Sequence, residues 1–296
     1  MAKNGLGRVP AIPMSARHMS YWDMFATWVG ANANNGTWYI GGVIAACGFL
    51  TASTTLIVTG IISYLLLAAA SYMGYKTGLT AMTLTRASFG LRGSLLPSVI
   101  NLVQFIGWAA VNTFIAATSM SYLFHDLFGW PVYGKPGGTM GLAVGIIVMS
   151  IFHLLSISVG QRSVQMIERS VVPLKYLRGI WESIVVFKTV SFHEIMSWQP
   201  PHNLKMTPGA AVDVLAAFNL AWVTAASDFS RFTGVKKNAT QASFLGANLG
   251  LFWFAFIGLI ATIGTAITLN HFDPNNSDPS TIASKLGLGF LAMIVI

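Results

Sequence analysis

Four polar or aromatic side chains follow one face of an apolar stretch in the first half of the chain. Asn101, Gln104, Trp108 and Asn112 are separated by three, four and four residues, so they share one side of a helix. An indole stacks on a planar heteroaromatic ring, and amides donate and accept hydrogen bonds in the plane of that ring. The spacing predicts a wall that recognises such a ring, and hydrogen bonding to a neighbouring helix is the alternative.

A second group of amides lies in the segment 28–42, WVGANANNGTWYIGG. It contains Asn32, Asn34 and Asn35 together with four glycines, inside a stretch long and apolar enough to cross a bilayer. Unsatisfied polar groups are costly in hydrocarbon, and irregular backbone is tolerated there only where it is buried in protein or lines a cavity. We therefore expect a helix broken near residues 30–36 whose backbone and amides face a binding site. Tight packing of a small-residue face is the alternative.

A later apolar stretch carries Phe218, Asn219 and Trp222 near its middle. These side chains would supply the wall opposite Trp108, although each of them alone is as well explained by packing. Charged residues are rarer inside the apolar stretches, and Lys175, Arg178 and Glu182 share one face of another stretch. Either they have a function, or Lys175 reaches the membrane surface while Arg178 and Glu182 neutralise each other.

Composition places the whole chain in a membrane. Of its residues, 54% are hydrophobic and only 9% are charged, whereas soluble domains have about 25% charged residues. We therefore expect a single all-α polytopic membrane domain over residues 1–296, with 1–20 as a polar N-terminal segment. Its expected helices cover about 21–50, 53–73, 95–123, 140–159, 165–187, 209–228, 242–269 and 281–296.

The basic residues predict the orientation of these helices. Although the net charge of +8 would also suit a nucleic-acid partner, the lysines and arginines alternate between loops. Eleven lie in the N-terminal segment and in every second loop, against three on the other side, or four with Lys188. Positive residues accumulate on the cytoplasmic side, so the N-terminus is expected there, in the cell inner membrane.

Several motifs resemble those of the nucleobase:cation symporter-1 family, the cytosine, allantoin and hydantoin permeases. The matching blocks, in chain order, are PMSARH, NGTWYIGG, KTGLT, R-x-SFG, GS-x-LPS, IGW and SDFSRF. The resemblance is strongest to the cytosine permease branch. It implies a leucine-transporter-type fold with two inverted five-helix repeats and broken helices 1 and 6. The first repeat would occupy 21–189, and 209–296 would be a partial second repeat, truncated after helix 7 and part of helix 8.

The resemblance also implies roles for individual residues. Trp108 matches the tryptophan that stacks on the substrate, and Asn34 matches a side chain of helix 1 that touches it. Backbone carbonyls of Gly30 and Ala33 match those that coordinate the cation. Gln104 stands four residues before Trp108 instead of three, Asn112 matches a glutamine of hydantoin carriers, and Asn219 replaces an aromatic residue.

The expected function is import of a nucleobase or related heterocycle by symport with sodium. Coupling to protons through Lys175 is the alternative, because a lysine of helix 5 replaces sodium in some relatives of this fold. A non-transporting fragment is a further alternative. A channel would need a carbonyl filter or ring of charges, and an enzyme a metal cluster or nucleophile–base pair, which the sequence does not display. We expect a monomer that binds neither a cofactor beyond the coupling ion nor nucleic acid.

Overall fold

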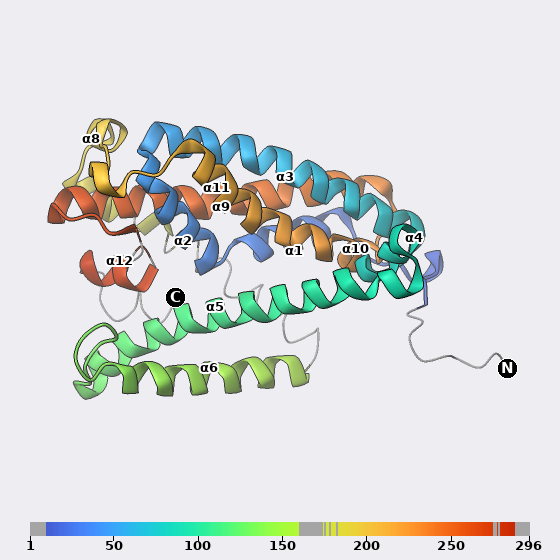
Figure 1. Cartoon of the computed structure of the whole chain (residues 1–296), viewed down its shortest axis with the longest axis horizontal. Helices are drawn as coiled ribbons and strands as arrows, with labels where there is room; N and C mark the ends of the chain where they lie inside the picture. The colour runs from blue at the N-terminus through green and yellow to red at the C-terminus, as the bar shows by residue number, and fades with distance from the viewer. Residues whose placement is uncertain are drawn as a thin grey trace. The chain divides into compact units, whose positions relative to one another are not determined.

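The computed structural model describes residues 10–159, 174, 176, 177, 179–181, 183–274, 277 and 279–287 (Figure 1). Its named elements are all α- or 3-10 helices, which confirms the expected all-α class. The chain divides into two compact units. Unit 1 consists of Met1–Asn32, Ile57–Ile106 and Asp213–Leu251. Unit 2 consists of Ala33–Leu56, Gly107–Val212 and Phe252–Ile296.

The first expected helix is broken where the glycines and amides predicted. After a short 3-10 turn, η1 (Met14–Ala16), helix α1 covers Tyr21–Asn32 and helix α2 covers Asn35–Ile44. Residues 33 and 34 form a bend between them. A second 3-10 turn, η2 (Ala45–Cys47), ends this part of the chain.

Long apolar helices account for most of both units. These are α3 (Phe49–Thr77), α5 (Leu95–Phe128), α6 (Thr139–Val159) and α11 (Lys236–Leu269). Among the described residues, five segments are long and apolar enough to cross a membrane: Phe49–Thr77, Leu95–Phe128, Thr139–Ser156, His202–Ser230 and Lys236–Leu269.

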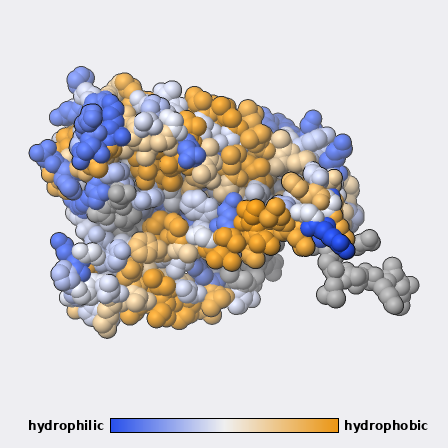
Figure 2. Space-filling view, viewed as in Figure 1, coloured by the Kyte–Doolittle hydropathy of each residue, from blue (hydrophilic) through white to orange (hydrophobic). Residues whose placement is uncertain are grey.

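Large apolar side chains remain on the surface of these helices. On α3 they include Ile61, Ile62 and Leu65, and on α6 they include Ile147 and Leu154. Figure 2 shows apolar side chains gathered over α3 and over α6. An apolar outer surface is costly in water and favourable against lipid tails, so this pattern fits helices that face a bilayer.

The segment between α3 and α5 contains a helix where a plain connection was expected. Helix α4 covers Ala81–Gly93, and the side chain of Thr80 caps it by accepting the N–H of Thr83. A kink occurs at Gly90, whose φ of 70° favours glycine. The carboxylate of Asp228 accepts the N–H of Ala81 at 3.1 Å, so a second cap comes from another part of unit 1.

The expected helix 6 is also interrupted, as the family resemblance implied. Helix α9 (Pro208–Ala221) is followed by a 3-10 turn, η4 (Trp222–Ala225), and by α10 (Ala226–Ser230). A change to 3-10 geometry inside a helix often marks a functional hinge or strain. Before α9, the expected loop contains the short helix α8 (Phe192–Ser197) and the 3-10 turn η3 (His202–Leu204).

Glycines of α11 allow close approach of helix 1 in each unit. In unit 1, a Cβ at Gly250 would lie 2.7 Å from the carbonyl oxygen of Val29 in α1. In unit 2, a Cβ at Gly258 would lie 2.1 Å from the carbonyl oxygen of Trp38 in α2. Small residues let membrane helices pack backbone against backbone.

Two smaller features complete unit 2. The thiol of Cys47 is buried and lies 3.4 Å from the carbonyl oxygen of Met206. Helix α12 covers Pro279–Lys285 and begins the expected helix 8, whose remaining residues lie outside the described ones. Of the expected helix 5, residues 183–189 are helical, and most of its first half also lies outside the described residues.

Candidate functional site

A fully buried polar cluster lies at the C-terminal end of α1 in unit 1. The side chains of Asn32, Tyr64 and Asn219 come from α1, α3 and α9, and none of the three has exposed surface. The hydroxyl of Tyr64 donates to Oδ1 of Asn32 at 2.5 Å, and Nδ2 of Asn32 donates to the carbonyl oxygen of Trp28 at 3.1 Å. Three helices of this unit are therefore joined by hydrogen bonds inside the protein.

Hydrogen bonds determine which atom of the Asn219 side-chain amide faces Tyr64. Its Oδ1 lies 3.2 Å from the hydroxyl of Tyr64, whose single proton is already donated to Asn32. Its Nδ2 is buried and lacks a partner among the described residues. Exchanging the two amide atoms, which have nearly the same shape, lets Nδ2 donate to Tyr64. One continuous chain of donors then runs from Asn219 through Tyr64 and Asn32 to the backbone of Trp28.

Aromatic rings surround the same end of α1. The ring of Trp28 is fully buried and meets Trp222 edge to face, with centroids 6.1 Å apart. Trp28 also meets Phe229 of α10, at 5.6 Å. Phe218 is nearly buried, at 5% exposed, and Trp222 is partly exposed. Trp222 thus belongs to a group of aromatic side chains in unit 1 and packs against Trp28 of α1.

Gln104 contacts the break of helix 6. Its Nε2 donates to the carbonyl oxygen of Ala221 at 3.3 Å and lies 3.5 Å from Oγ1 of Thr224. Ala221 is the last residue of α9, where helical carbonyls lose their intrahelical partners. The amide that was predicted to recognise a substrate therefore satisfies the backbone of an interrupted helix in this structure.

Gly30, Ala33 and Asn34 lie at the break of helix 1, each in a different local structure. Gly30 lies in the last turn of α1, where carbonyl groups have no intrahelical donor, and Ala33 is buried in the bend. Asn34 caps α2, because its Oδ1 accepts the N–H of Thr37 at 3.0 Å. The carbonyl end of one helix and the N–H end of the next suit a cation and an anion, respectively.

Trp108 and Asn112 lie on α5 in unit 2. Trp108 is partly exposed, and Asn112 is exposed. Nδ2 of Asn112 donates to the carbonyl oxygen of Trp108 at 2.9 Å, one helical turn back. This bond ties the amide to the backbone of Trp108, on the same face of α5.

The predicted residues therefore fall into two groups. Unit 1 brings Gln104, Asn219 and Trp222 to α9 and its break, together with Phe218 on α9 and Gly30 on α1. Unit 2 contains Ala33 and Asn34 at the bend, and Trp108 and Asn112 on α5. Lys175 lies outside the described residues. Within the described part of the chain, no group of three or more His, Cys, Asp and Glu side chains could hold a metal ion.

Tyr64 is the residue that sequence reasoning missed. Its hydroxyl is the centre of the buried cluster, yet it stands alone among apolar neighbours in SYLLLAAA. A lone tyrosine in a span has no periodic pattern to mark it. The available signal was chemical, because a phenol buried at membrane depth needs a partner, and the amides of helix 1 are candidates.

Comparison with solved structures shows that this fold is shared with a known membrane transporter. The structure resembles Mhp1, a nucleobase-cation-symport-1 family transporter, in a closed conformation with bromovinylhydantoin bound. The TM-score is 0.76 and the identity 17%, over 96% of this chain and 62% of the other. An inward-facing conformation of Mhp1 has a TM-score of 0.74 at 16% identity, and this chain covers 63% of it. The predicted leucine-transporter-type fold is thereby confirmed.

Sequence comparison identifies the family. Residues 11–296 match the family of permeases for cytosine/purines, uracil, thiamine and allantoin, and the chain belongs to that family. YxlA of Bacillus subtilis, assigned as a purine-cytosine permease, is 26% identical over 96% of this chain and 59% of its own length. The allantoin permease of the same organism is 24% identical over 90% of this chain and 58% of its own. The chain thus spans about three fifths of the length of these relatives.

Proposed function

We propose that the protein imports a nucleobase or a related heterocycle by symport with a cation. The observation that carries this proposal is the break of helix 1 at residues 33 and 34, inside an apolar segment. Membrane proteins tolerate such a break only where it is covered by protein or lines a cavity, and carriers use it to bind substrate and ion. Membership of the permease family supports the same assignment.

The proposed cation ligands are the backbone carbonyls of Gly30 and Ala33. Gly30 belongs to the last turn of α1, where the helix dipole is negative. Sodium is the proposed ion, and proton coupling through Lys175 is the alternative. Uptake measured with an imposed sodium gradient, and then with a proton gradient, separates them. Sodium dependence that survives Lys175→Ala supports the first, whereas proton-driven uptake lost in Lys175→Ala supports the second.

In unit 2, the proposed substrate wall is Trp108, with Asn112 and Asn34 as hydrogen-bonding side chains. In unit 1, Phe218 and Trp222 are proposed as an aromatic surface for the substrate. Trp108 is partly exposed and Asn112 is held beside it, which supports stacking with in-plane recognition. Gln104 and Asn219 are assigned an indirect part, since the first binds the carbonyl of Ala221 and the second is fully buried against Tyr64.

We further propose that the protein is a monomer in the plasma membrane, with its N-terminus in the cytoplasm. The asymmetry of lysine and arginine between alternate loops supports this orientation. Cysteine labelling of intact cells would test it: a cysteine at position 135 is expected to react with a membrane-impermeant reagent, and one at position 86 is not.

Counterflow of labelled bases in proteoliposomes tests the transport function. Trp108→Ala is expected to raise the half-saturating concentration by about 10- to 100-fold, because stacking on a base contributes about 1–3 kcal/mol. Trp22→Ala removes an indole that is 70% exposed near the start of α1 and is the matched control. Unchanged uptake in Trp108→Ala would remove α5 from the substrate wall, and no counterflow by wild type would refute carrier function.

A further inference from the structure

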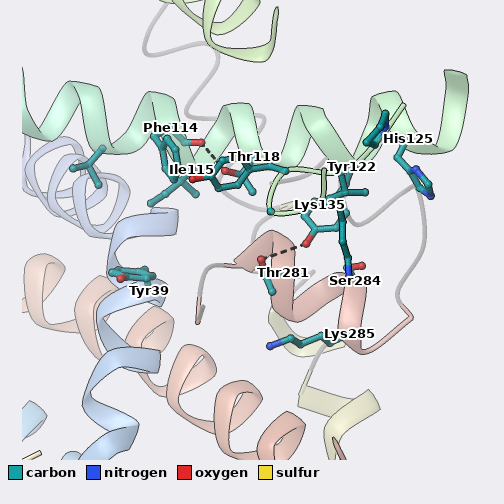
Figure 3. Close-up of a pocket in the computed structure, with 15 residues that line it drawn as sticks. Tyr39, Phe114, Ile115, Thr118, Tyr122, His125, Lys135, Thr281, Ser284 and Lys285 are labelled. Carbon is teal, nitrogen blue, oxygen red and sulfur yellow. Dashed lines mark hydrogen bonds between the residues drawn. The ribbon is translucent and has the colours of Figure 1, made fainter. Parts of the chain in front are cut away.

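A cavity of ≈ 1010 Å³ opens in unit 2, outside the residues proposed for the substrate wall (Figure 3). The second half of α5 forms one side, the loop that follows α5 forms another, and Thr281, Ser284 and Lys285 of α12 form a third. Tyr39 of α2 completes the lining. In Figure 3 its ring lies across the cavity from the labelled side chains of α12.

The side of the cavity that α5 forms leads toward Trp108. The lining residues of this helix include Val111, Ile115, Thr118 and Tyr122, which recur every three or four residues. Trp108 stands three residues before Val111, so it continues the same helical face toward the middle of α5. A ligand in the cavity would therefore sit one to four turns from the indole along a single helix surface.

The charge of the lining has one sign. Its ionisable side chains other than tyrosine are His125, Lys135 and Lys285, and none of the described residues that line the cavity is Asp or Glu. Tyr133 and Ser284, which also line it, carry hydroxyl groups. A cleft with lysines and without carboxylates attracts anions, and hydroxyls can donate to their oxygen atoms.

The loop that carries Lys135 is held in place by α5. The backbone N–H of Tyr133 donates to Oγ of Ser121 at 2.9 Å, and the ring of Tyr133 meets Phe114 edge to face at 5.5 Å. Nδ1 of His125 donates to the carbonyl oxygen of Trp130 at 2.8 Å. The cationic side chain of Lys135 thus projects from a folded loop, which lowers the ordering cost of binding.

Helix α12 is fixed to the same helix. The hydroxyls of Tyr122 and Thr281 lie 3.4 Å apart, as the dashed line in Figure 3 shows. Ala283 is fully buried beside Tyr122, Leu123 and Leu286. Lys285, at the end of α12, is therefore presented to the cavity by a packed helix.

We propose that this cavity is an access site that binds anionic planar heterocycles before they reach Trp108. This inference rests on the proposed transport function and names a substrate class for it. Lys135 and Lys285 would neutralise a carboxylate or an ionised ring, the aromatic pair Phe114 and Tyr133 would offer apolar contact to the ring, and the α5 surface would guide it inward. Neutral heterocycles would gain the aromatic contacts without the charge, so the cavity would favour the anion.

Two ligands that share a ring but differ in charge test the proposal. Uracil is neutral near pH 7, and orotate is the same ring with a carboxylate. Binding of each is measured on the full chain in detergent, for wild type and for a variant that combines Lys135→Gln with Lys285→Gln. We expect the double variant to bind orotate about tenfold more weakly or worse, and to bind uracil as wild type does. Lys205→Gln, an exposed lysine outside the lining, is the matched control and should change neither.

Further measurements separate this inference from the transport function. Trp108→Ala should raise the half-saturating concentration for counterflow by about 10- to 100-fold, while orotate binding stays within about twofold of wild type, because the cavity is intact. Raising the salt concentration should slow association of orotate with wild type and leave that of uracil unchanged, a test that needs no variant. Equal loss of both ligands in the double variant, or no binding of orotate by wild type, would overturn the access site. Absence of counterflow by wild type, with orotate binding still dependent on the two lysines, would instead refute transport alone.

Discussion

Two polar regions of the molecule differ in their access to water. In unit 1, Asn32, Tyr64 and Asn219 have no exposed surface and are joined by hydrogen bonds. In unit 2, the cavity beside α5 has an open lining in which Tyr133 is 40% exposed. Amides and hydroxyls inside an apolar span therefore do not by themselves mark a ligand site. Without open space beside them, they fasten helices together.

This contrast applies to the two polar regions and not to the whole units, because unit 2 also contains closely packed helices. A Cβ at Gly258 would lie 2.1 Å from the carbonyl oxygen of Trp38. We expect Gly258→Ala to destabilise the protein by about 3 kcal/mol, since backbone atoms must move to admit the methyl group. Thermal unfolding in detergent measures it. Gly107→Ala, where a Cβ would meet nothing within 4 Å, is the control and should be neutral or slightly stabilising.

The next prediction removes one hydroxyl from each region. Tyr64→Phe should cost about 1–3 kcal/mol, because Oδ1 of Asn32 and the amide of Asn219 lose their partner in a fully buried site. Tyr133→Phe should change stability by less than about 0.5 kcal/mol, because its side chain is exposed at the cavity. Chemical denaturation of both variants gives the comparison. Equal losses would mean that the two regions do not differ as described.

Transport by amide variants sharpens the contrast further. Asn219→Ala should lower uptake of all heterocycles by a similar factor of about five, because it acts through Tyr64 and the end of α1. Asn112→Ala should instead change the ranking among cytosine, uracil, allantoin and hydantoins, because its exposed amide is proposed to bond the ring of the substrate. A changed ranking in Asn219→Ala would show that this amide contacts the substrate after all.

The smallest expected effect lies in α8, outside the spans. Hydrogen bonds from the hydroxyl and the backbone N–H of Ser191 lower the pKa of Glu194 below its ordinary value of 4.5. Because the pKa is lower in the folded protein, ionised Glu194 stabilises the fold at pH values above its ordinary pKa. This stabilisation is lost as the pH falls through the pKa of the folded state. The stability difference between wild type and Glu194→Gln, followed by thermal unfolding from about pH 6 to about pH 3, should therefore shrink. A stability difference that does not change with pH would contradict this prediction.

Much of the fold was predictable because it depends on local composition. The long apolar helices followed from hydropathy, and the break between α1 and α2 followed from glycines and amides within one of them. Helix α4 was not foreseen, because it buries none of its residues and so lacks a hydrophobic stripe. Its start depends on caps from Thr80 and from Asp228, the latter 147 residues away in sequence.

The candidate site was less predictable, because spacing identifies a helix face but not what the face meets. The face that carries Gln104 and Trp108 follows from helical periodicity. That Gln104 would bind the carbonyl of Ala221 depends on the 3-10 turn of helix 6, which no local pattern indicates. Asn34 likewise resembles a recognition residue in sequence, and its role as a cap of α2 becomes evident only where the helix restarts.

The burial of Cys47 has a practical consequence for labelling chemistry. It is the one cysteine among these 296 residues; it is the last residue of η2, is 4% exposed and contacts the carbonyl of Met206. A water-soluble thiol reagent would therefore find little of it to attack. A cysteine placed at position 135 would stand exposed on the rim of the cavity and could be modified selectively. Reagents that add an ammonium or a sulfonate would then set the charge at that position to either sign in the same protein, and a reductant would reverse it.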